Sequence, residues 1–431
     1  MWTSLILLAT AGNLIALASA QAPTPLCCMA YATVDETTLY IQGGAGRSGS
    51  YLNNQFFSLD LTISGWNASS PPWKVLPVGA GIHSAPLAHS HAMTTTRDNK
   101  KLVVWGTFTG FSIYDIATAV WTNDTLYHPI FADGSRQASM ALDPTTGLVY
   151  VPAGVNKGTG MLVYDPVATN TTVVPMFPST VLSSFLNVGN SFVWSELRKS
   201  FLYFGGFNQA VFNQYMIEYQ PSTYSWTQIS TEGVQAQLAS HCMVPAYDGT
   251  KMVVFGGWKP AAMGAPDQGP TYSSALYMLD VKTMNWTLLS DGEVNGRRSM
   301  ACTVVGDNFV AWGGVDTTNQ LASIQIYNLK SNRWVDQYVF TAVEPPPSNN
   351  KLGVFIGLGV VAAVCIGVLL GWIVFKCRKS RAAKAHTMDN QVSSRSVTPQ
   401  DPQDVKTAMQ WSPYEQLPQY PQAMSSIESS P

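Results

Sequence analysis

The stretch MVVFGGW (252–258) is an apolar run that ends on a pair of glycines. The same pattern occurs upstream as FLYFGGF (201–207) and downstream as VAWGGV (310–315). A short apolar run bounded by glycine is typical of a buried β-strand whose end lies close to another backbone. Its recurrence predicts a repeated structural unit.

Weaker versions of this pattern extend the series toward the N-terminus. The landmarks then recur about every fifty residues, which is the signature of a repeat architecture. The three further segments are LYIQGGAG (39–46), LVVWGTF (102–108) and VYVPAGV (149–155).

A second landmark, a tryptophan, follows most of these segments. An aromatic or aliphatic side chain stands seven residues before it, usually followed by a short polar residue. Each unit is therefore predicted to contain four strands: one before the glycine pair, one ending on it, one at the aromatic residue and one beginning at the tryptophan. The segments are LDLTISGW (59–66), YDIATAVW (114–121), YQPSTYSW (219–226), LDVKTMNW (279–286), YNLKSNRW (327–334) and, with Thr171 in place of tryptophan, YDPVATNT (164–171).

One such sheet cannot bury both of its faces, whereas six sheets arranged radially can. The glycine pair, the spaced tyrosine and tryptophan, and the period resemble kelch repeats over roughly residues 26–340, most closely in the last three units. The resemblance implies an all-β fold, a six-bladed kelch-type β-propeller. The first and last units each contain all four strands, so the closure of the ring and the absence of a seventh blade stay open.

Composition and the chain ends set the context. Charged residues make up 12% of the 431 residues and aromatic residues 11%, and a net charge of −2 gives no reason to expect nucleic acid. Residues 1–20 predict a secretory signal peptide. Residues 352–375 carry no charge and precede the basic segment KCRKSRAAK (376–384), which predicts one transmembrane helix with its C-terminal side in the cytoplasm.

The expected organisation is a propeller outside the cell (21–342), a proline-rich stalk (343–351), the membrane helix and a disordered cytoplasmic tail (376–431). The expected location is the plasma membrane or another membrane of the secretory pathway. Glycines in the span leave dimerisation through the helix open. The acceptors predicted for N-glycosylation all precede the span and are Asn67, Asn123, Asn170 and Asn285.

Three cysteines of the predicted propeller occupy related places in their units. Cys28 and Cys242 each precede a methionine at the expected first strand, and Cys302 is displaced by one position. A disulfide from Cys302 to either of the other two is one interpretation. Unpaired buried thiols are the other, because a one-residue shift turns a side chain to the opposite face of a strand.

The loop after each glycine pair and the loop before each first strand are expected on one face, which we call the loop face. Loops on a rigid scaffold commonly carry binding residues. In the alternative interpretation, the arginine and histidine side chains cap strands and bind loop carbonyls. The candidate binding residues are Arg47, His91, Arg136, His241, Trp258, Lys259, Arg297 and Arg298.

The tail contains WSPYEQLPQYPQ (411–422), which is rich in aromatic residues. Tyr414 and Leu417 resemble a tyrosine-based sorting signal read by cytoplasmic adaptors. Leu417, Pro418 and Tyr420 resemble a ligand of WW domains, for which proline pre-extends the chain.

These observations predict a cell-surface glycoprotein whose propeller binds an extracellular protein or glycan, with no cofactor, and whose tail recruits trafficking or signalling adaptors. The alternative is a membrane-tethered copper oxidase acting on carbohydrate, since kelch-type propellers include galactose oxidase. That family needs histidine and tyrosine ligands, and no pair of histidines here has a spacing diagnostic of a metal site. The identity of the ligand is not encoded in any motif.

Overall fold

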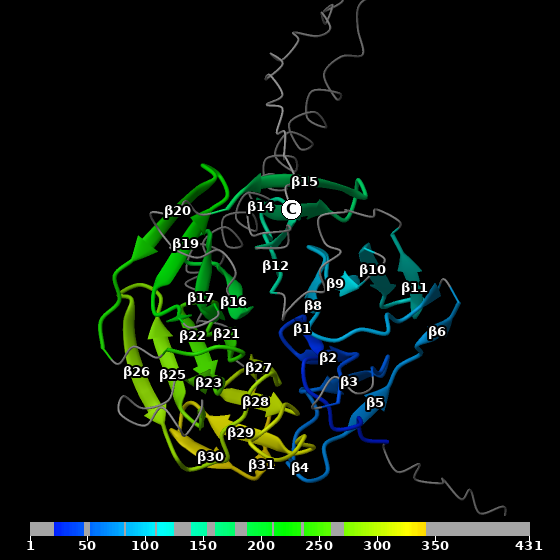
Figure 1. The fold of residues 1–431 in the computed structure, drawn as a ribbon. Coiled ribbons are helices and arrows are strands. Elements are labelled where there is room, and N and C mark those ends of the chain that lie inside the picture. Colours follow the sequence, from blue (N-terminus) through cyan, green and yellow to red (C-terminus); the bar gives the residue numbers. More distant parts are fainter. Residues whose placement is uncertain are drawn as a thin grey trace, which may run out of the picture. The chain divides into compact units, whose positions relative to one another are not determined.

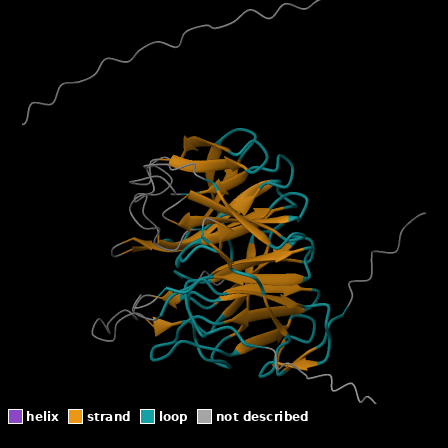
Figure 2. Ribbon diagram, turned by 90° about the vertical axis from the view of Figure 1, so that its right-hand side faces the viewer, coloured by secondary structure: helices purple, strands orange, loops and turns teal. Residues whose placement is uncertain are grey.

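A computed structural model describes most of the first of two units of the chain, Met1–Glu344, and none of the second, Pro345–Pro431. The described part consists of strands and loops and contains no helix (Figure 2). The described residues are 21–46, 52–81, 83–107, 110–124, 139–152, 160–176, 188–208, 211–233, 237–259 and 271–341.

Six antiparallel sheets of four strands follow one another around a ring, which confirms the predicted six-bladed propeller (Figure 1). Blade one contains β1 (Ala30–Val34), β2 (Thr38–Gln42), β3 (Phe56–Asp60) and β5 (Trp73–Val75). Blade two contains β8 (Ala92–Thr95), β9 (Lys101–Thr107), β10 (Gly110–Asp115) and β11 (Val120–Asn123). Blade three contains β12 (Ala141–Leu142), β13 (Val149–Val151), β14 (Gly160–Asp165) and β15 (Asn170–Pro175).

The second half of the ring repeats this order. Blade four contains β16 (Val188–Ser195), β17 (Ser200–Asn208), β19 (Met216–Gln220) and β20 (Ser225–Ile229). Blade five contains β21 (Cys242–Ala246), β22 (Lys251–Phe255), β25 (Leu276–Asp280) and β26 (Asn285–Ser290). Blade six contains β27 (Ala301–Val305), β28 (Asn308–Trp312), β29 (Ile324–Asn328) and β30 (Arg333–Val335).

One short strand, β18 (Val211–Phe212), pairs with β17 and adds a fifth strand to the sheet of blade four. The short strands outside these sheets are β4 (Trp66–Asn67), β6 (Gly79–Ala80), β7 (His83–Ser84), β23 (Trp258–Lys259), β24 (Thr271–Tyr272) and β31 (Gln337–Tyr338).

The apolar runs that end on glycine form the second strand of each blade. In β28 all five residues are buried, whereas most residues of the outermost strand β15 are exposed or half-buried. A strand covered on both faces by neighbouring blades has no polar side to present, so its sequence is continuously apolar rather than alternating. The core thus lies between the blades.

The seven-residue spacing to the tryptophan is explained by strand register. Tyr219 in β19 lies directly opposite Trp226 in β20, with ring centroids 4.6 Å apart. The intervening turn places Tyr224 in the left-handed region with φ 54°. The short polar residue after the aromatic one stabilises such turns: the Asp115 carboxylate, for instance, accepts a hydrogen bond from the Thr118 amide at 2.9 Å.

Blade one departs from the predicted spacing. The strand opposite Leu59 begins at Trp73, not at Trp66, so the prediction that Trp66 starts the fourth strand is wrong. Trp66 lies instead in β4, which pairs with β31 near the end of the propeller. An insertion between the two tryptophans explains the error, because it moves the first one out of the blade and leaves the second to take its place.

In blades one, four, five and six the glycine pair lies where the blade contacts the next one. Gly205 has a φ of 69°, and a Cβ there would lie 2.4 Å from His241 Cε1 and 2.5 Å from the Leu238 carbonyl oxygen. The amide of Gly206 donates a hydrogen bond to that same carbonyl at 2.9 Å. Glycine is required because no side chain fits the contact and because the backbone is left-handed.

The same amide-to-carbonyl contact recurs around the ring. The donor and acceptor residues are Gly44 and Ala88, Gly257 and Arg297, and Gly314 and Leu26. Since Gly314 belongs to blade six and Leu26 precedes blade one, this contact also closes the ring. None of the described strands is exchanged between the terminal sheets, and the β4–β31 pair adds a second connection across the seam.

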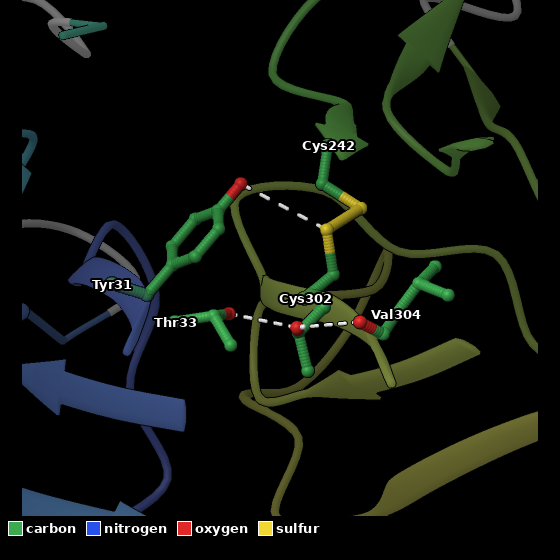
Figure 3. Close-up of a disulfide and its surroundings, with 6 residues drawn as sticks. Tyr31, Thr33, Cys242, Cys302 and Val304 are labelled. Atoms are coloured by element: carbon green, nitrogen blue, oxygen red, sulfur yellow. Dashed lines mark hydrogen bonds between the residues drawn. A yellow bond between two sulfur atoms is a disulfide. The ribbon is translucent and has the colours of Figure 1, made fainter. Parts of the chain in front are cut away.

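A disulfide joins the inner strands of blades five and six. It connects Cys242 in β21 with Cys302 in β27, whose Cα atoms are 6.4 Å apart. Tyr31 of blade one reaches the same place, with its hydroxyl 3.8 Å from Cys302 Sγ (Figure 3). Cys28 does not take part: it precedes β1 with a φ of 64°, the conformation that Ser240 adopts two residues before Cys242.

Candidate binding face

The loop face carries buried polar side chains as well as exposed ones. His91, His241 and Arg297, all predicted for the binding face, are buried, with exposed fractions of 3%, 7% and 1%. These side chains are therefore not exposed on the outer surface of the loop face, although His91 and His241 contribute to the lining of a central cavity. Each lies in a loop that leads into an inner strand, and each packs against a glycine of the preceding blade with its side chain or its carbonyl group.

Arg297 fixes a loop of blade six. Its guanidinium donates hydrogen bonds to the carbonyls of Gly313 at 3.1 Å and Ser323 at 3.0 Å, and to the Ser323 hydroxyl at 3.0 Å. Burial lowers the pKa of Arg297 to about 10, so the group still carries its charge at neutral pH. This arrangement matches the alternative in which the cation binds loop carbonyls.

The two buried histidines are neutral and pack between neighbouring blades. His91 Nε2 lies 2.6 Å from Gln42 Oε1, and the His241 ring packs edge-on against Phe204 at 5.3 Å between centroids. Burial lowers the pKa of His241 to about 3, and burial together with the neighbouring His89 lowers that of His91 to about 3.

Among the described residues of the loop face, an aromatic cluster lies between blades four and five. It consists of Phe207, Phe212 and Trp258, whose ring centroids are 4.8 to 5.3 Å apart. All three side chains are half-buried. Two short extensions carry them: β18 folds back on the end of β17, and β23 pairs with β24.

Basic residues flank the aromatic cluster. The Arg298 guanidinium lies 5.5 Å from the centroid of the Tyr272 ring, a cation–π contact. Lys259 follows Trp258 in β23 and is exposed. Trp258, Lys259 and Arg298 are thus the described members of the predicted face that are exposed or half-buried.

Sequence reasoning missed Phe207, Phe212 and Tyr272. For Phe207 a signal was present, since it directly follows a glycine pair in blade four as Trp258 does in blade five. The equivalent positions in blades one and six are Ala45 and Val315, both buried. An aromatic residue there is therefore not needed for the fold. No comparable signal pointed to Phe212 or Tyr272.

A cavity of about 930 Å³ lies between the inner strands of the blades. Acidic side chains at its lining come from the turns that follow inner strands, opposite to the loop face. Its described lining contains no lysine or arginine, so the potential there favours cations. The acidic residues are Asp35, Glu36, Glu196 and Asp248.

Several predicted sites lie outside the described residues. They include the signal peptide (1–20), Arg47, Arg136, the span (352–375), and the tail residues Tyr414, Leu417, Pro418 and Tyr420. Among described residues no helix is long and apolar enough to cross a membrane.

The glycosylation acceptors lie at blade edges. Asn170 and Asn285 are exposed at the outer strands of blades three and five, Asn67 is exposed in β4, and Asn123 at the end of β11 is half-buried. Within the described ranges no three His, Cys, Asp or Glu side chains come together in a way that could hold a metal ion.

Comparisons with known proteins agree with this geometry. A family model described as the KLHDC2/KLHL20/DRC7 Kelch-repeats domain matches residues 192–367. The solved structure of YjhT is similar over 73% of this chain and 98% of its own, with a TM-score of 0.55 and 14% identity, a likeness of fold alone. No curated protein matches the sequence. The chain therefore contains a kelch-repeat domain folded as a six-bladed β-propeller, a type of domain that suggests protein binding.

Proposed function

We propose that this protein is a single-pass cell-surface glycoprotein that binds an extracellular protein through the loop face of blades four to six. The observation that carries the proposal is the aromatic cluster of Phe207, Phe212 and Trp258. These side chains are not required by the repeat, and they remain half-buried on a rigid scaffold.

The composition of this surface suits a protein partner. Tryptophan, tyrosine and arginine are the residues that most often contribute large binding energies at protein interfaces. Trp258, Tyr272 and Arg298 lie together here, and the Arg298–Tyr272 contact holds the guanidinium in place before a ligand arrives. Such preorganisation reduces the entropy lost on binding. A glycan that stacks on the aromatic rings is the other ligand class to be tested.

The proposed location rests on the sequence and on the cysteines. A signal peptide at 1–20 and a span at 352–375 would place the propeller outside the cell. The Cys242–Cys302 disulfide fits such an oxidising environment. Exposed Asn67, Asn170 and Asn285 would be accessible to the glycosylation machinery.

The proposed tail function depends on two short motifs. Tyr414 and Leu417 would engage a sorting adaptor, and Leu417, Pro418 and Tyr420 would engage a WW domain. Both motifs lie on the side of the span that the basic residues assign to the cytoplasm.

The location is tested by expressing the full chain with one epitope after Ala20 and another after Pro431. Antibody should reach the first epitope on intact cells and the second only after permeabilisation, and an N-glycosidase should lower the apparent mass. An N-terminal epitope that stays hidden on intact cells would contradict the proposal.

Binding is tested on the same full-length chain by comparing ligand binding of cells that carry Trp258→Ala, Lys259→Glu or Tyr224→Ala. Tyr224 is an exposed aromatic residue at the outer edge of blade four and serves as the matched control. Trp258→Ala should weaken protein binding about 30-fold at equal surface expression. If Trp258→Ala weakened the binding of glycan probes alone, the ligand would be a glycan instead of a protein. Equal binding by all variants would overturn the proposed face.

A further inference from the structure

Two adjacent cysteines lie at the seam where the ring closes. Cys27 and Cys28 are thiols in the structure, and their sulfur atoms are 2.8 Å apart. Cys27 is buried, whereas Cys28 is partly accessible and contributes to the lining of the central cavity. The two sulfurs therefore face each other at the edge of the central cavity.

The backbone holds this pair from both sides. Cys27 exchanges hydrogen bonds with Ala45, with N–O distances of 3.2 and 3.0 Å. The Cys28 amide donates to the Ser299 carbonyl of blade six at 3.0 Å, and its carbonyl accepts from the Ser90 amide of blade two at 2.7 Å. Cys28 thus links three blades, and its φ of 64° is part of that connection.

The state of the other cysteines in the propeller indicates the redox environment of this protein. The other two cysteines of the described residues, Cys242 and Cys302, form a disulfide between blades five and six. Structural disulfides persist where the surroundings are oxidising. An environment that oxidises that pair also exposes Cys28, the more accessible thiol of the adjacent pair, to the same oxidants.

We propose that Cys27 and Cys28 form a disulfide between adjacent residues, and that this bond is a reversible redox site at the closure of the ring. The oxidant is a small-molecule or protein disulfide. The Cys28 thiolate attacks one sulfur of the oxidant and releases one thiol, which leaves a mixed disulfide on Cys28. Cys27 then loses its proton, attacks Cys28 Sγ and releases the second thiol. Two electrons and two protons pass from the cysteine pair to the oxidant.

The order of these steps follows from the surroundings of the two thiols. The hydrogen bond with Cys28, burial and the charge of an ionised Cys28 all raise the pKa of Cys27 well above its ordinary value, because a Cys28 thiolate accepts the Cys27 proton and repels a second negative charge. A thiol in that state is a poor nucleophile, so the first attack belongs to Cys28. Formation of the mixed disulfide removes the negative charge of the Cys28 thiolate and with it the interaction that most strongly suppresses ionisation of Cys27.

The proposed bond should be reduced more easily than the existing disulfide. Adjacent residues across a trans peptide have Cα atoms about 3.8 Å apart, below the usual range for disulfides. Cys242 and Cys302 are 6.4 Å apart and fall within that range. Geometric strain makes a disulfide more reducible, so the two bonds should separate in a redox titration.

The test is differential alkylation and mass spectrometry of the full-length chain, isolated without reductant and then equilibrated with graded mixtures of reduced and oxidised glutathione. We expect the peptide with Cys27 and Cys28 to be about 2 Da lighter than its dithiol form. It should become alkylatable at a lower ratio of reduced to oxidised glutathione than Cys242 and Cys302. Phenylarsine oxide, which binds paired thiols, should capture only the reduced protein.

Two variants separate the proposal from a structural effect. Cys28→Ser should abolish both the mass change and arsenical capture while the Cys242–Cys302 disulfide remains intact. Cys27→Ser should leave Cys28 as a mixed disulfide with glutathione, because no neighbouring sulfur remains to release it. Alkylation of both Cys27 and Cys28 in protein whose Cys242–Cys302 bond is complete would overturn the proposal. So would a disulfide from either residue to another cysteine.

Discussion

Trp66 stacks on Tyr338, with ring centroids 4.7 Å apart and an angle of 11° between the ring planes. The two residues come from opposite ends of the propeller, and the Tyr338 hydroxyl also donates to the Leu61 carbonyl at 2.8 Å. This contact supports the seam between blades six and one, which is also joined by hydrogen bonds between loops, by the short β4–β31 pair and by a shared apolar core in which Trp73 packs against Trp312.

Removing this contact should destabilise the whole propeller. Tyr338 is fully buried, so we expect Tyr338→Ala to lower the free energy of unfolding by about 3 kcal/mol. Tyr338→Phe, which loses only the hydrogen bond to Leu61, should cost about 1 kcal/mol. Denaturant titration checks both values. Equal and small losses for the two variants would show that the seam does not limit stability.

The contact between blades four and five predicts a contrast between two glycines. Gly205→Ala should lower the free energy of unfolding by about 3 kcal/mol, because the backbone is left-handed and the new methyl group collides with the loop of Leu238 and His241. Gly65 is also left-handed, with φ 82°, but a Cβ there meets no atom within 4 Å. Gly65→Ala should therefore cost only about 1 kcal/mol. If the two substitutions cost the same, the close approach of the blades is not what requires glycine at Gly205.

The buried histidines predict how stability changes with pH. The pKa of His241 is about 3 in the folded protein and 6.5 in its unperturbed state, so the unfolded chain binds more protons between these values. The stabilising contribution is complete above about pH 6.5 and is lost as the pH falls toward 3, with a slope of at most about 1.4 kcal/mol per pH unit for each such histidine.

His241→Met tests this dependence with a residue that the fold already uses. Met300 leads into blade six and packs against a glycine of blade five. His241 leads into blade five and packs in the same way against a glycine of blade four. Denaturant titrations between pH 6.5 and 4 should show a smaller loss of stability in the variant. An unchanged slope would mean that His241 is protonated without cost in the folded state.

The disulfide between blades five and six should contribute to stability. Its two cysteines are 60 residues apart, and replacing both by serine should lower the free energy of unfolding by about 3 kcal/mol. Thermal unfolding of the double variant, compared with the parent protein with and without reductant, measures this contribution. A double variant as stable as the unreduced parent would contradict the expectation.

Much of the fold could be predicted because the repeated sequence features correspond to specific contacts within and between blades. The apolar runs, the glycine pairs and the spacing of tyrosine to tryptophan each correspond to one structural requirement: burial on both faces, close approach, and a cross-strand pair. The error at Trp66 arose because an insertion between Trp66 and Trp73 preserved the spacing for a residue outside the blade.

The candidate site was less predictable. Charge and polarity pointed to His91, His241 and Arg297, but their neighbours bury them, and neighbours across a ring cannot be identified from one repeat alone. The aromatic cluster depends on two extensions, β18 and β23, that only some blades possess. Trp258 was found because it ends the most regular repeat, and Phe212 was missed because no repeat position corresponds to it.

The most direct test of the central claim is site-specific photo-crosslinking on intact cells. A photoreactive phenylalanine analogue is placed at Phe212 in the aromatic cluster, or at Tyr224 on the outer edge of the same blade as the control. The account predicts a discrete crosslinked protein from Phe212 that disappears when Trp258→Ala is added, and none from Tyr224. Crosslinks of equal yield from both positions, or from Tyr224 alone, would contradict binding through the loop face.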